Sequence, residues 1–357
     1  MHSSTSSFDF QRPIPDLPWR GLLVVTLLLT ALGTGAWEIR ARALGYAPGL
    51  NDTSDLWADQ REKVAPDSVV IIGDSRALFD LDLDALQQGL GPRPLQLALV
   101  GSCAYPILEN LAKDETFHGT VIASIIPAMW LVPPQAPPYK NSLTALNRYR
   151  TRTVAQKASH HLGMLLEEQI AFMKQDDLVL SQLLARISVP NRATFVAPPV
   201  LPPYFATIAR DRRTRMTESC AQPGALQERV KNGWIPLFSP PKFPDFMPKE
   251  VLDGMAKASE ARFGETVAAV NKIRARGGKV VFIRFPHSGE LKNFEDAGIP
   301  RAGPWTRLMN ETGAPNIYYS DYPELIYECP EWSHLSDSQS VEFTQRLVPY
   351  LKQALGK

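Results

Sequence analysis

The stretch "VVIIGDSRALFD", residues 69–80, places four apolar, β-prone residues before Gly-Asp-Ser-Arg and an amphipathic run. A short apolar run of this kind is typical of a buried strand, and the Asp-Ser pair after it is typical of a helix N-terminus. Ser75 therefore has two interpretations. It is either a nucleophile held at a strand-to-helix turn or an ordinary capping residue behind a core strand.

Further strand and helix signals follow this stretch. The apolar segment "LQLALVGS" (95–102) predicts a second strand, "YPILENLAKD" (105–114) a helix, and "TVIASIIPAMWLV" (120–132) a third strand. Strands that alternate with helices in this way are typical of a parallel sheet covered by helices. The sequence therefore predicts an α/β fold with a three-layer core around a parallel sheet.

The same pattern stops after residue 132 and returns near residue 249. Residues 249–277 predict one long amphipathic helix that ends at the Gly277-Gly278 pair, because the apolar residues recur at helical spacing. Residues 279–286 predict a strand, and residues 341–355 predict the closing helix. The core is thus expected to form from two separate parts of the chain.

A large insertion separates these two parts. Residues 142–187 carry apolar residues at spacings of three and four and are expected to be helical, whereas residues 189–248 are expected to be loops. The basic run "ARDRRTR" (209–215) is either a solvated face or a contact for an anionic substrate. The expected segments are a disordered tail (1–18), a transmembrane anchor (19–38), a linker (39–65), the core (66–132 and 249–357) and the insertion (133–248).

The composition of the chain limits which classes of protein it can belong to. The chain has 357 residues, of which 44% are hydrophobic, and a formal net charge of +1. It is long enough to bury a large core, and its near-neutral charge argues against nucleic acid as a partner. Neither a CxxC motif nor a Cys/His metal spacing occurs, so the sequence predicts no metal site and no cofactor.

Residues 21–37 contain no charged side chain and are flanked by tryptophan and charged residues. This pattern predicts a membrane anchor at the short end of the usual range. The alternative is a cleaved signal peptide, since residues 34–36 are small enough for cleavage. Two arginines lie on each side, so charge leaves the orientation open: Arg12 and Arg20 before the segment, Arg40 and Arg42 after it.

Residues that follow the strands are the first candidates for chemistry, because ligands of open parallel sheets bind at the carboxyl ends of the strands. Ser75 opens a helix after the first strand, so its own N–H can face a developing oxyanion. Gly101 follows the second strand and allows a similar approach of its N–H. Gly101 is otherwise an ordinary turn residue at a strand end.

A serine nucleophile needs a base, and His334 has the most informative context of the six histidines. Glu331 stands three residues before it, and a carboxylate at that spacing can reach the imidazole Nδ1–H and fix the tautomer. Asp321 is an alternative carboxylate. The other interpretation of His334 is a polar residue ahead of a helix capped by Ser336 or Asp337.

Three cysteines allow one disulfide and leave one thiol. If the domain is extracytoplasmic, we expect Cys220 to pair with Cys329, because Cys103 lies next to the candidate site.

"VVIIGDSRA", Gly101 and the Glu-x-x-His before the last helix resemble blocks I, II and V of the SGNH/GDSL hydrolase superfamily. The N-terminal anchor, the segment "FIRFP" (282–286) and the "SHL…FT…L" ending more narrowly resemble membrane-anchored SGNH-like proteins of bacterial polysaccharide O-acetylation systems. The resemblance covers about half of the chain and does not include the insertion. It implies a flavodoxin-like, three-layer SGNH core.

The same resemblance implies roles for individual residues. Ser75 would be the nucleophile, His334 the general base and acid, and Glu331 the residue that orients the histidine; the N–H groups of Ser75 and Gly101 would form the oxyanion hole. The chain departs from the family twice. It has Glu331 where an aspartate is usual, and residues 121–130 offer no asparagine after the third strand. Loss of one oxyanion donor typically costs roughly 10²–10³ in kcat.

The implied function is that of a membrane-tethered O-acyltransferase, in particular an O-acetyltransferase, or an esterase acting on an extracytoplasmic polysaccharide. The resemblance places the protein in the bacterial inner membrane with its catalytic domain in the periplasm, and it implies a multispanning membrane O-acyltransferase as a partner. The alternative is a catalytically weak polysaccharide-binding or assembly subunit, which the missing asparagine and the long insertion favour.

Several polar and aromatic residues near the expected strand ends are candidates for substrate binding. Arginines could hold a sugar hydroxyl or a uronate carboxylate, although such residues are more often surface ion pairs, and tryptophans are more often packing residues. The candidates are Asp74, Arg76, Arg284, Ser288, Arg301 and Trp332.

Overall fold

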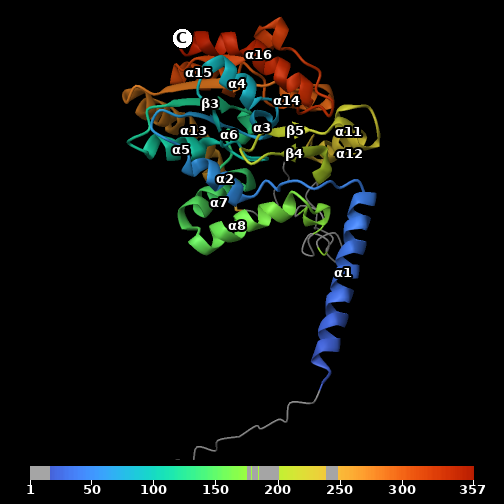
Figure 1. Cartoon of the computed structure of the whole chain (residues 1–357). Coiled ribbons are helices and arrows are strands. Elements are labelled where there is room, and N and C mark those ends of the chain that lie inside the picture. Colours follow the sequence, from blue (N-terminus) through green and yellow to red (C-terminus); the bar gives the residue numbers. More distant parts are fainter. Residues whose placement is uncertain (1–16, 175–177, 179–183, 185–200, 239–247) are drawn as a thin grey trace, which may run out of the picture.

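Five parallel strands form the central sheet of the molecule (Figure 1). The computed structural model describes residues 17–174, 178, 184, 201–238 and 248–357. The strands of the sheet are β1 (Val69–Ile72), β2 (Leu95–Gln96), β3 (Thr120–Ser124), β6 (Lys279–Arg284) and β7 (Asn316–Tyr318). Their order is β2-β1-β3-β6-β7, which is the 2-1-3-4-5 order of flavodoxin-like sheets when these strands alone are numbered. The predicted α/β fold with a parallel sheet is confirmed.

The central strands are apolar because both of their faces are covered. All four residues of β1 are buried, and β1 pairs with β3 from Val69 opposite Thr120 to Ile72 opposite Ala123. The second strand is formally only two residues long, yet the chain continues alongside β1. Leu97 N–H donates to the Ile71 carbonyl at 2.8 Å, and Leu99 N–H donates to the Gly73 carbonyl at 3.0 Å. This pairing carries the chain to the carboxyl end of β1.

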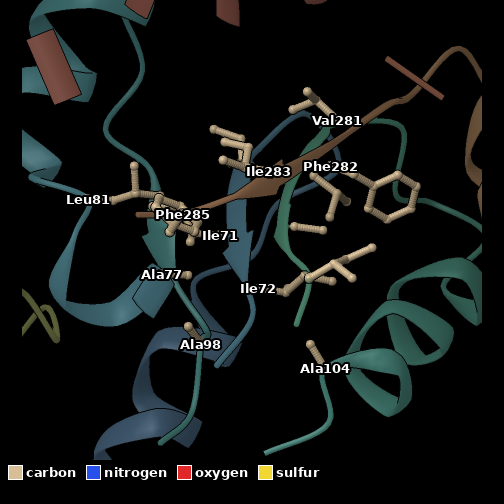
Figure 2. Packing of buried hydrophobic residues seen from close by; sticks show 14 of the residues in the cluster. Ile71, Ile72, Ala77, Leu81, Ala98, Ala104, Val281, Phe282, Ile283 and Phe285 are labelled. Carbon is tan, nitrogen blue, oxygen red and sulfur yellow. The ribbon is translucent and has the colours of Figure 1, made fainter. Parts of the chain in front are cut away.

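Helices cover the two faces of the sheet. On one face α4 (Leu83–Leu90) packs with α16 (Asp337–Ala354), and on the other α5 (Tyr105–Lys113) packs with α13 (Lys249–Ala275). Figure 2 shows Ile71, Ile283 and Phe285 on the face toward Leu81, and Ile72 and Phe282 on the face toward Ala104. The alternation follows from the two-residue period of a strand. The further helices that belong to the core are α3 (Ser75–Phe79), α6 (Pro127–Trp130), α14 (Gly289–Gly298) and α15 (Pro304–Thr312), with 3₁₀ turns η4 (Tyr319–Asp321) and η5 (Pro323–Leu325).

The insertion is more regular than the sequence indicated. Its first half forms α7 (Pro137–Thr151), α8 (Val154–Glu167) and the 3₁₀ turn η1 (Ala171–Met173). Its second half, which we expected to be loops, contains η2 (Pro203–Phe205), a hairpin of β4 (Ala206–Ile208) and β5 (Thr214–Met216), α11 (Glu218–Ala221), α12 (Ala225–Trp234) and η3 (Ile235–Phe238). These pieces are too short for a periodic pattern to reveal them. Residues 175–177, 179–183, 185–200 and 239–247 lie outside the described part of the chain.

The basic run at the hairpin is only partly solvated, and its arginines have partners within the protein. Arg212 is fully buried, and its guanidinium donates to Asp52 Oδ1 at 2.7 Å and to the Ala98 carbonyl at 2.7 Å. Arg210 pairs with a carboxylate of the preceding helix, and Arg213 pairs with carboxylates at the start of α4. The run therefore attaches the hairpin to the linker and to the core, whereas a contact with an anionic substrate stays a prediction.

Helix α1 (Trp19–Ala43) has 25 residues and is long and apolar enough to cross a membrane. Helix α2 (Ser54–Glu62) follows α1 in the linker and packs on α7. The end of α1 contacts the body of the protein, because Glu38 accepts the N–H groups of Ala171 at 3.0 Å and Phe172 at 3.1 Å. The tail predicted to be disordered lies, up to residue 16, outside the described residues.

The cysteines do not form the expected disulfide. Cys103, Cys220 and Cys329 are all free and buried. Cys220 lies in α11 of the insertion, whereas Cys329 lies in the loop before the last helix, where its backbone is bonded to Ser288. Each thiol is packed separately, and burial raises the pKa of the Cys103 thiol to about 11 and that of Cys220 to about 12. The predicted pairing of Cys220 with Cys329 is therefore wrong.

Candidate active site

A cavity of about 480 Å³ is lined by both Ser75 and His334. Its walls come from three parts of the chain: residues 50–52 of the linker, the core with α3, Val100 and His334, and the insertion. The insertion supplies the largest share, including Phe205 at the hairpin and Trp234 at the end of α12. The segment that sequence patterns left without a role thus encloses the candidate site.

The turn that presents Ser75 depends on Gly73. Its φ is +154°, and a Cβ at this position would lie 2.5 Å from Ser124 Cβ and 2.8 Å from Ala77 Cβ. Only glycine fits this close approach without displacing its neighbours. The chain can therefore leave β1 and enter α3 at once, which places Ser75 at the first helical position.

Asp74, not Ser75, caps α3. Asp74 Oδ1 accepts the Arg76 N–H at 2.8 Å, and its Oδ2 accepts the Ser124 hydroxyl at 3.1 Å. Both oxygens of this buried carboxylate are therefore occupied by the protein. Of the two interpretations of Ser75, the capping role belongs to its neighbour, and the half-buried Ser75 side chain lies at the cavity.

Glu331 fixes the orientation of His334. The imidazole Nδ1 lies 2.8 Å from Glu331 Oε1, and the backbone N–H of His334 donates to the same oxygen at 2.6 Å. The Trp234 indole N–H donates to Glu331 Oε2. With Nδ1–H directed at the carboxylate, Nε2 is the ring nitrogen that can accept a proton. Nε2 is buried and has no hydrogen-bond partner among the described residues.

Aromatic side chains surround the imidazole. The His334 ring stacks on Phe79 with 4.3 Å between centroids, and the Trp234 and Phe205 rings lie at 5.8 and 6.4 Å. This packing restricts rotation of the imidazole, and it makes the part of the cavity next to Nε2 apolar. Such a surface suits the hydrocarbon part of a small acyl group.

Asp80 connects the end of α3 to the histidine loop. Asp80 Oδ1 accepts the Leu335 N–H at 2.8 Å, directly after His334, and the Asp80 carbonyl accepts the Thr344 hydroxyl at 3.3 Å. Burial raises the pKa of Asp80 well above its ordinary value, and the negative charge of Glu331 adds to the effect. Nothing in the local sequence distinguishes this aspartate, because its partners lie more than 250 residues away.

The oxyanion donors expected from the sequence are placed as follows. Ser75 N–H is in the first turn of α3, where no helical carbonyl can accept it. Gly101 is exposed with a φ of +59°, and its carbonyl accepts the Asn141 amide at 3.1 Å; its neighbour Val100, not Gly101, lines the cavity. A role for the Gly101 N–H stays a prediction.

Two of the substrate-binding candidates belong to a buried ionic cluster. Two Arg76 nitrogens donate to Glu295 at 3.1 and 2.5 Å, and Arg284 also binds Glu295. Burial alone would raise the pKa of Glu295, but the charges of Arg76 and Arg284 hold it well below its ordinary value. Burial, together with the same two arginines, lowers the pKa of His287 to about 2. The cluster fastens α14 to the sheet.

The remaining candidates also have protein partners, and none of them lines the cavity. Ser288 exchanges hydrogen bonds with the backbone of Cys329 at 3.1 and 3.0 Å. Arg301 pairs with Asp321 at 2.6 Å, so the alternative carboxylate is engaged elsewhere and Glu331 is the partner of His334. Trp332 packs against Gly289, where a Cβ would lie 2.3 Å from the indole.

Comparison with protein-family models and with curated proteins finds no match to this chain. Among the described residues, no group of three or more His, Cys, Asp or Glu side chains could hold a metal ion.

Proposed function

We propose that the protein is a membrane-tethered serine acyltransferase or esterase in which Ser75, His334 and Glu331 form the catalytic triad. One observation carries the proposal. His334 is held through Nδ1 by Glu331, while its buried Nε2 is unpartnered in the cavity that Ser75 also lines. A histidine ahead of a helix cap has no structural need for this arrangement.

The triad can perform acyl transfer in two balanced steps. Ser75 Oγ attacks the carbonyl carbon of an ester donor while His334 Nε2 takes its proton, and the tetrahedral intermediate collapses as that proton passes to the departing alkoxide. An acceptor hydroxyl then gives its proton to Nε2 and attacks the acyl-Ser75 ester, and Ser75 leaves with the proton returned. A sugar hydroxyl as acceptor makes the protein a transferase, and water makes it an esterase.

Glu331 supports both steps without exchanging protons itself. Its carboxylate keeps Nδ1 protonated and offsets the positive charge that the imidazole gains when Nε2 takes a proton. The Ser75 N–H is available to the tetrahedral oxyanion. The apolar wall formed by Phe79, Phe205 and Trp234 favours a short acyl chain beside the nucleophile.

The proposed substrate is an extracytoplasmic polysaccharide that carries or receives acetyl groups. This part of the proposal rests on the resemblance to membrane-anchored SGNH-like proteins and on α1, which is long and apolar enough to span a membrane. It includes the bacterial inner membrane as location, a periplasmic catalytic domain, and a multispanning O-acyltransferase as partner.

The test is the hydrolysis of p-nitrophenyl acetate by the full chain, with and without an oligosaccharide acceptor. Ser75→Ala and His334→Ala are each expected to lower kcat by roughly 10³-fold or more. His118→Ala is the matched control, because His118 is exposed and lies outside the cavity. Mass spectrometry after mixing should find acetyl on Ser75. Equal rates for the wild type and all three variants would disprove the triad.

A second function is a polysaccharide-binding or assembly subunit with weak catalysis. The observation that favours it is at Ser124, the polar residue that ends β3, whose hydroxyl donates to Asp74 and is not free for an oxyanion. For this function, Ser75→Ala would bind acetylated oligosaccharide as tightly as the wild type, and the two would release acetate at the same low rate.

A further inference from the structure

Helix α8 exposes large apolar side chains. Val154 is 83% exposed, Leu162 64%, Leu165 54% and Leu166 52%. Ala155 and Ala158 are exposed beside them. At 100° per residue, these six positions fall within one continuous arc of about 120° around the helix axis. Helices on the surface of soluble domains turn such an arc toward the core, so the outward direction requires another explanation.

The helix cannot rotate this arc inward, because its opposite side is attached to the protein. Glu167 accepts the Asn51 N–H at 2.9 Å, Met164 is buried, and Lys157 binds Glu62 of α2. A capping box between Thr153 and Gln156 fixes its start. The apolar face is therefore a stable surface of the folded domain.

The C-terminal end of α8 lies beside the end of α1. Arg42 donates to the Gln169 carbonyl just after α8, and Glu38 binds the backbone of η1, which follows. Ile39 and Leu44 at the end of α1 are also exposed. In Figure 1, α8 lies on the side of the body from which α1 extends, and it runs across the direction of α1. This is the position of the membrane surface if α1 spans a bilayer.

We infer that α8 is an interfacial helix that lies in the plane of the membrane and inserts its apolar arc among the lipid acyl chains. Together with α1 it attaches the domain at two points. The attachment fixes the height of the cavity above the lipid, because Lys174 and residues 50–52 line the cavity and lie close to α8 and η1. The inference does not depend on the reaction proposed for that cavity.

The test uses the full chain reconstituted into vesicles of phosphatidylethanolamine and phosphatidylglycerol. The three native cysteines are buried, so an environment-sensitive dye can be attached to single introduced thiols. The positions are Leu162→Cys and Leu165→Cys on the arc, with Gln353→Cys on α16 as the control at an exposed site on the far side of the body. At both arc positions, we expect a blue-shifted emission that doxyl-labelled lipids quench and iodide does not.

The inference fails if iodide quenches all three positions equally, since α8 then lies in water. It also fails if the arc positions resist both quenchers, because another protein or a second copy then covers them. A photoreactive diazirine lipid provides a measurement without substitutions. It should label residues 154–166 as well as α1 in the wild-type chain, and labelling of α1 alone would overturn the inference.

Discussion

His334 Nδ1 lies 2.8 Å from Glu331 Oε1, and the backbone N–H of His334 donates to the same oxygen at 2.6 Å. One carboxylate oxygen thus holds the imidazole and the loop that carries it. The other oxygen accepts the Trp234 indole N–H from the insertion. Because both Glu331 oxygens are occupied by neighbours in a fully buried site, the acidic group is fitted to positioning and not to proton transfer.

Replacement of this carboxylate tests the assignment directly. Glu331→Gln is expected to lower kcat by roughly 10²–10⁴-fold, because the amide can present an N–H to Nδ1 and stabilise the wrong imidazole tautomer. The measurement is kcat for p-nitrophenyl acetate across a range of pH. Glu290→Gln, an exposed position on α14, should retain wild-type rates. A Glu331→Gln variant with normal kcat would rule out the triad.

Trp234 extends the same network into the insertion. Trp234→Phe keeps an aromatic ring beside His334 but removes the N–H bonded to Glu331. We expect kcat to fall by roughly 10-fold, since a hydrogen bond to a charged group contributes about 1.5–3 kcal/mol. Trp37→Phe in α1 is the matched control and should leave kcat unchanged. The two variants are compared in one assay, and equal rates would mean that the indole N–H does not position Glu331.

The parts of the site that were predictable from sequence are local. The Gly-Asp-Ser turn follows directly from an apolar strand, and Glu331 lies three residues from His334, so short-range geometry was sufficient. Trp234 lies 97 residues from Glu331, and Asp80 contacts Leu335 across 255 residues. No local pattern encodes such contacts, because they depend on how the insertion and the last helix pack.

Charge at a strand end was less informative than expected. Arg76 and Arg284 lie at strand ends, as substrate-binding residues would, yet both are paired with Glu295 of α14. A sequence shows a cation but not the carboxylate that packs against it. The same limit applies to Arg212, whose partner Asp52 lies 160 residues away. The fold was predictable because its signal is local: each buried strand is a run of apolar residues that can be recognised without knowing its partners.

Gly73 is predicted to be essential for stability. Gly73→Ala would place a methyl group 2.5 Å from Ser124 Cβ at a φ unfavourable for alanine, and it should lower the free energy of unfolding by about 1–3 kcal/mol. Gly163→Ala is the matched control. Gly163 lies inside α8 with nothing within 4 Å, so the change should stabilise the chain by about 0.5–1 kcal/mol. Urea denaturation of the two variants checks both signs, and a stabilised Gly73→Ala would contradict the packing described.

His287 should make stability depend on pH. Burial and the charges of Arg76 and Arg284 lower its pKa from 6.5 to about 2, so the folded state keeps it neutral while the unfolded state protonates it. The folded state therefore keeps its full free energy of unfolding above pH 6.5. Below that pH, protonation of His287 in the unfolded state lowers the free energy of unfolding by about 1.4 kcal/mol per pH unit.

The variant that tests this is His287→Gln, which should flatten the loss of unfolding free energy between pH 6.5 and pH 5. His118→Gln, at an exposed histidine, should follow the wild-type curve. Parallel curves for wild type and His287→Gln would show that His287 is not held neutral.

Phe205 should limit the length of the acyl group. Its ring stacks on Phe79 with 5.5 Å between centroids and lies 6.4 Å from His334, so it closes the apolar wall next to the base. Phe205→Ala opens space for further methylene groups, each of which is worth roughly 10-fold or more in an apolar pocket. The kcat/KM ratio of p-nitrophenyl butyrate to acetate should therefore rise at least about 10-fold. Leu143→Ala, an exposed position on α7, should leave the ratio unchanged. A ratio that also stays constant in Phe205→Ala would mean that the acyl chain does not occupy this part of the cavity.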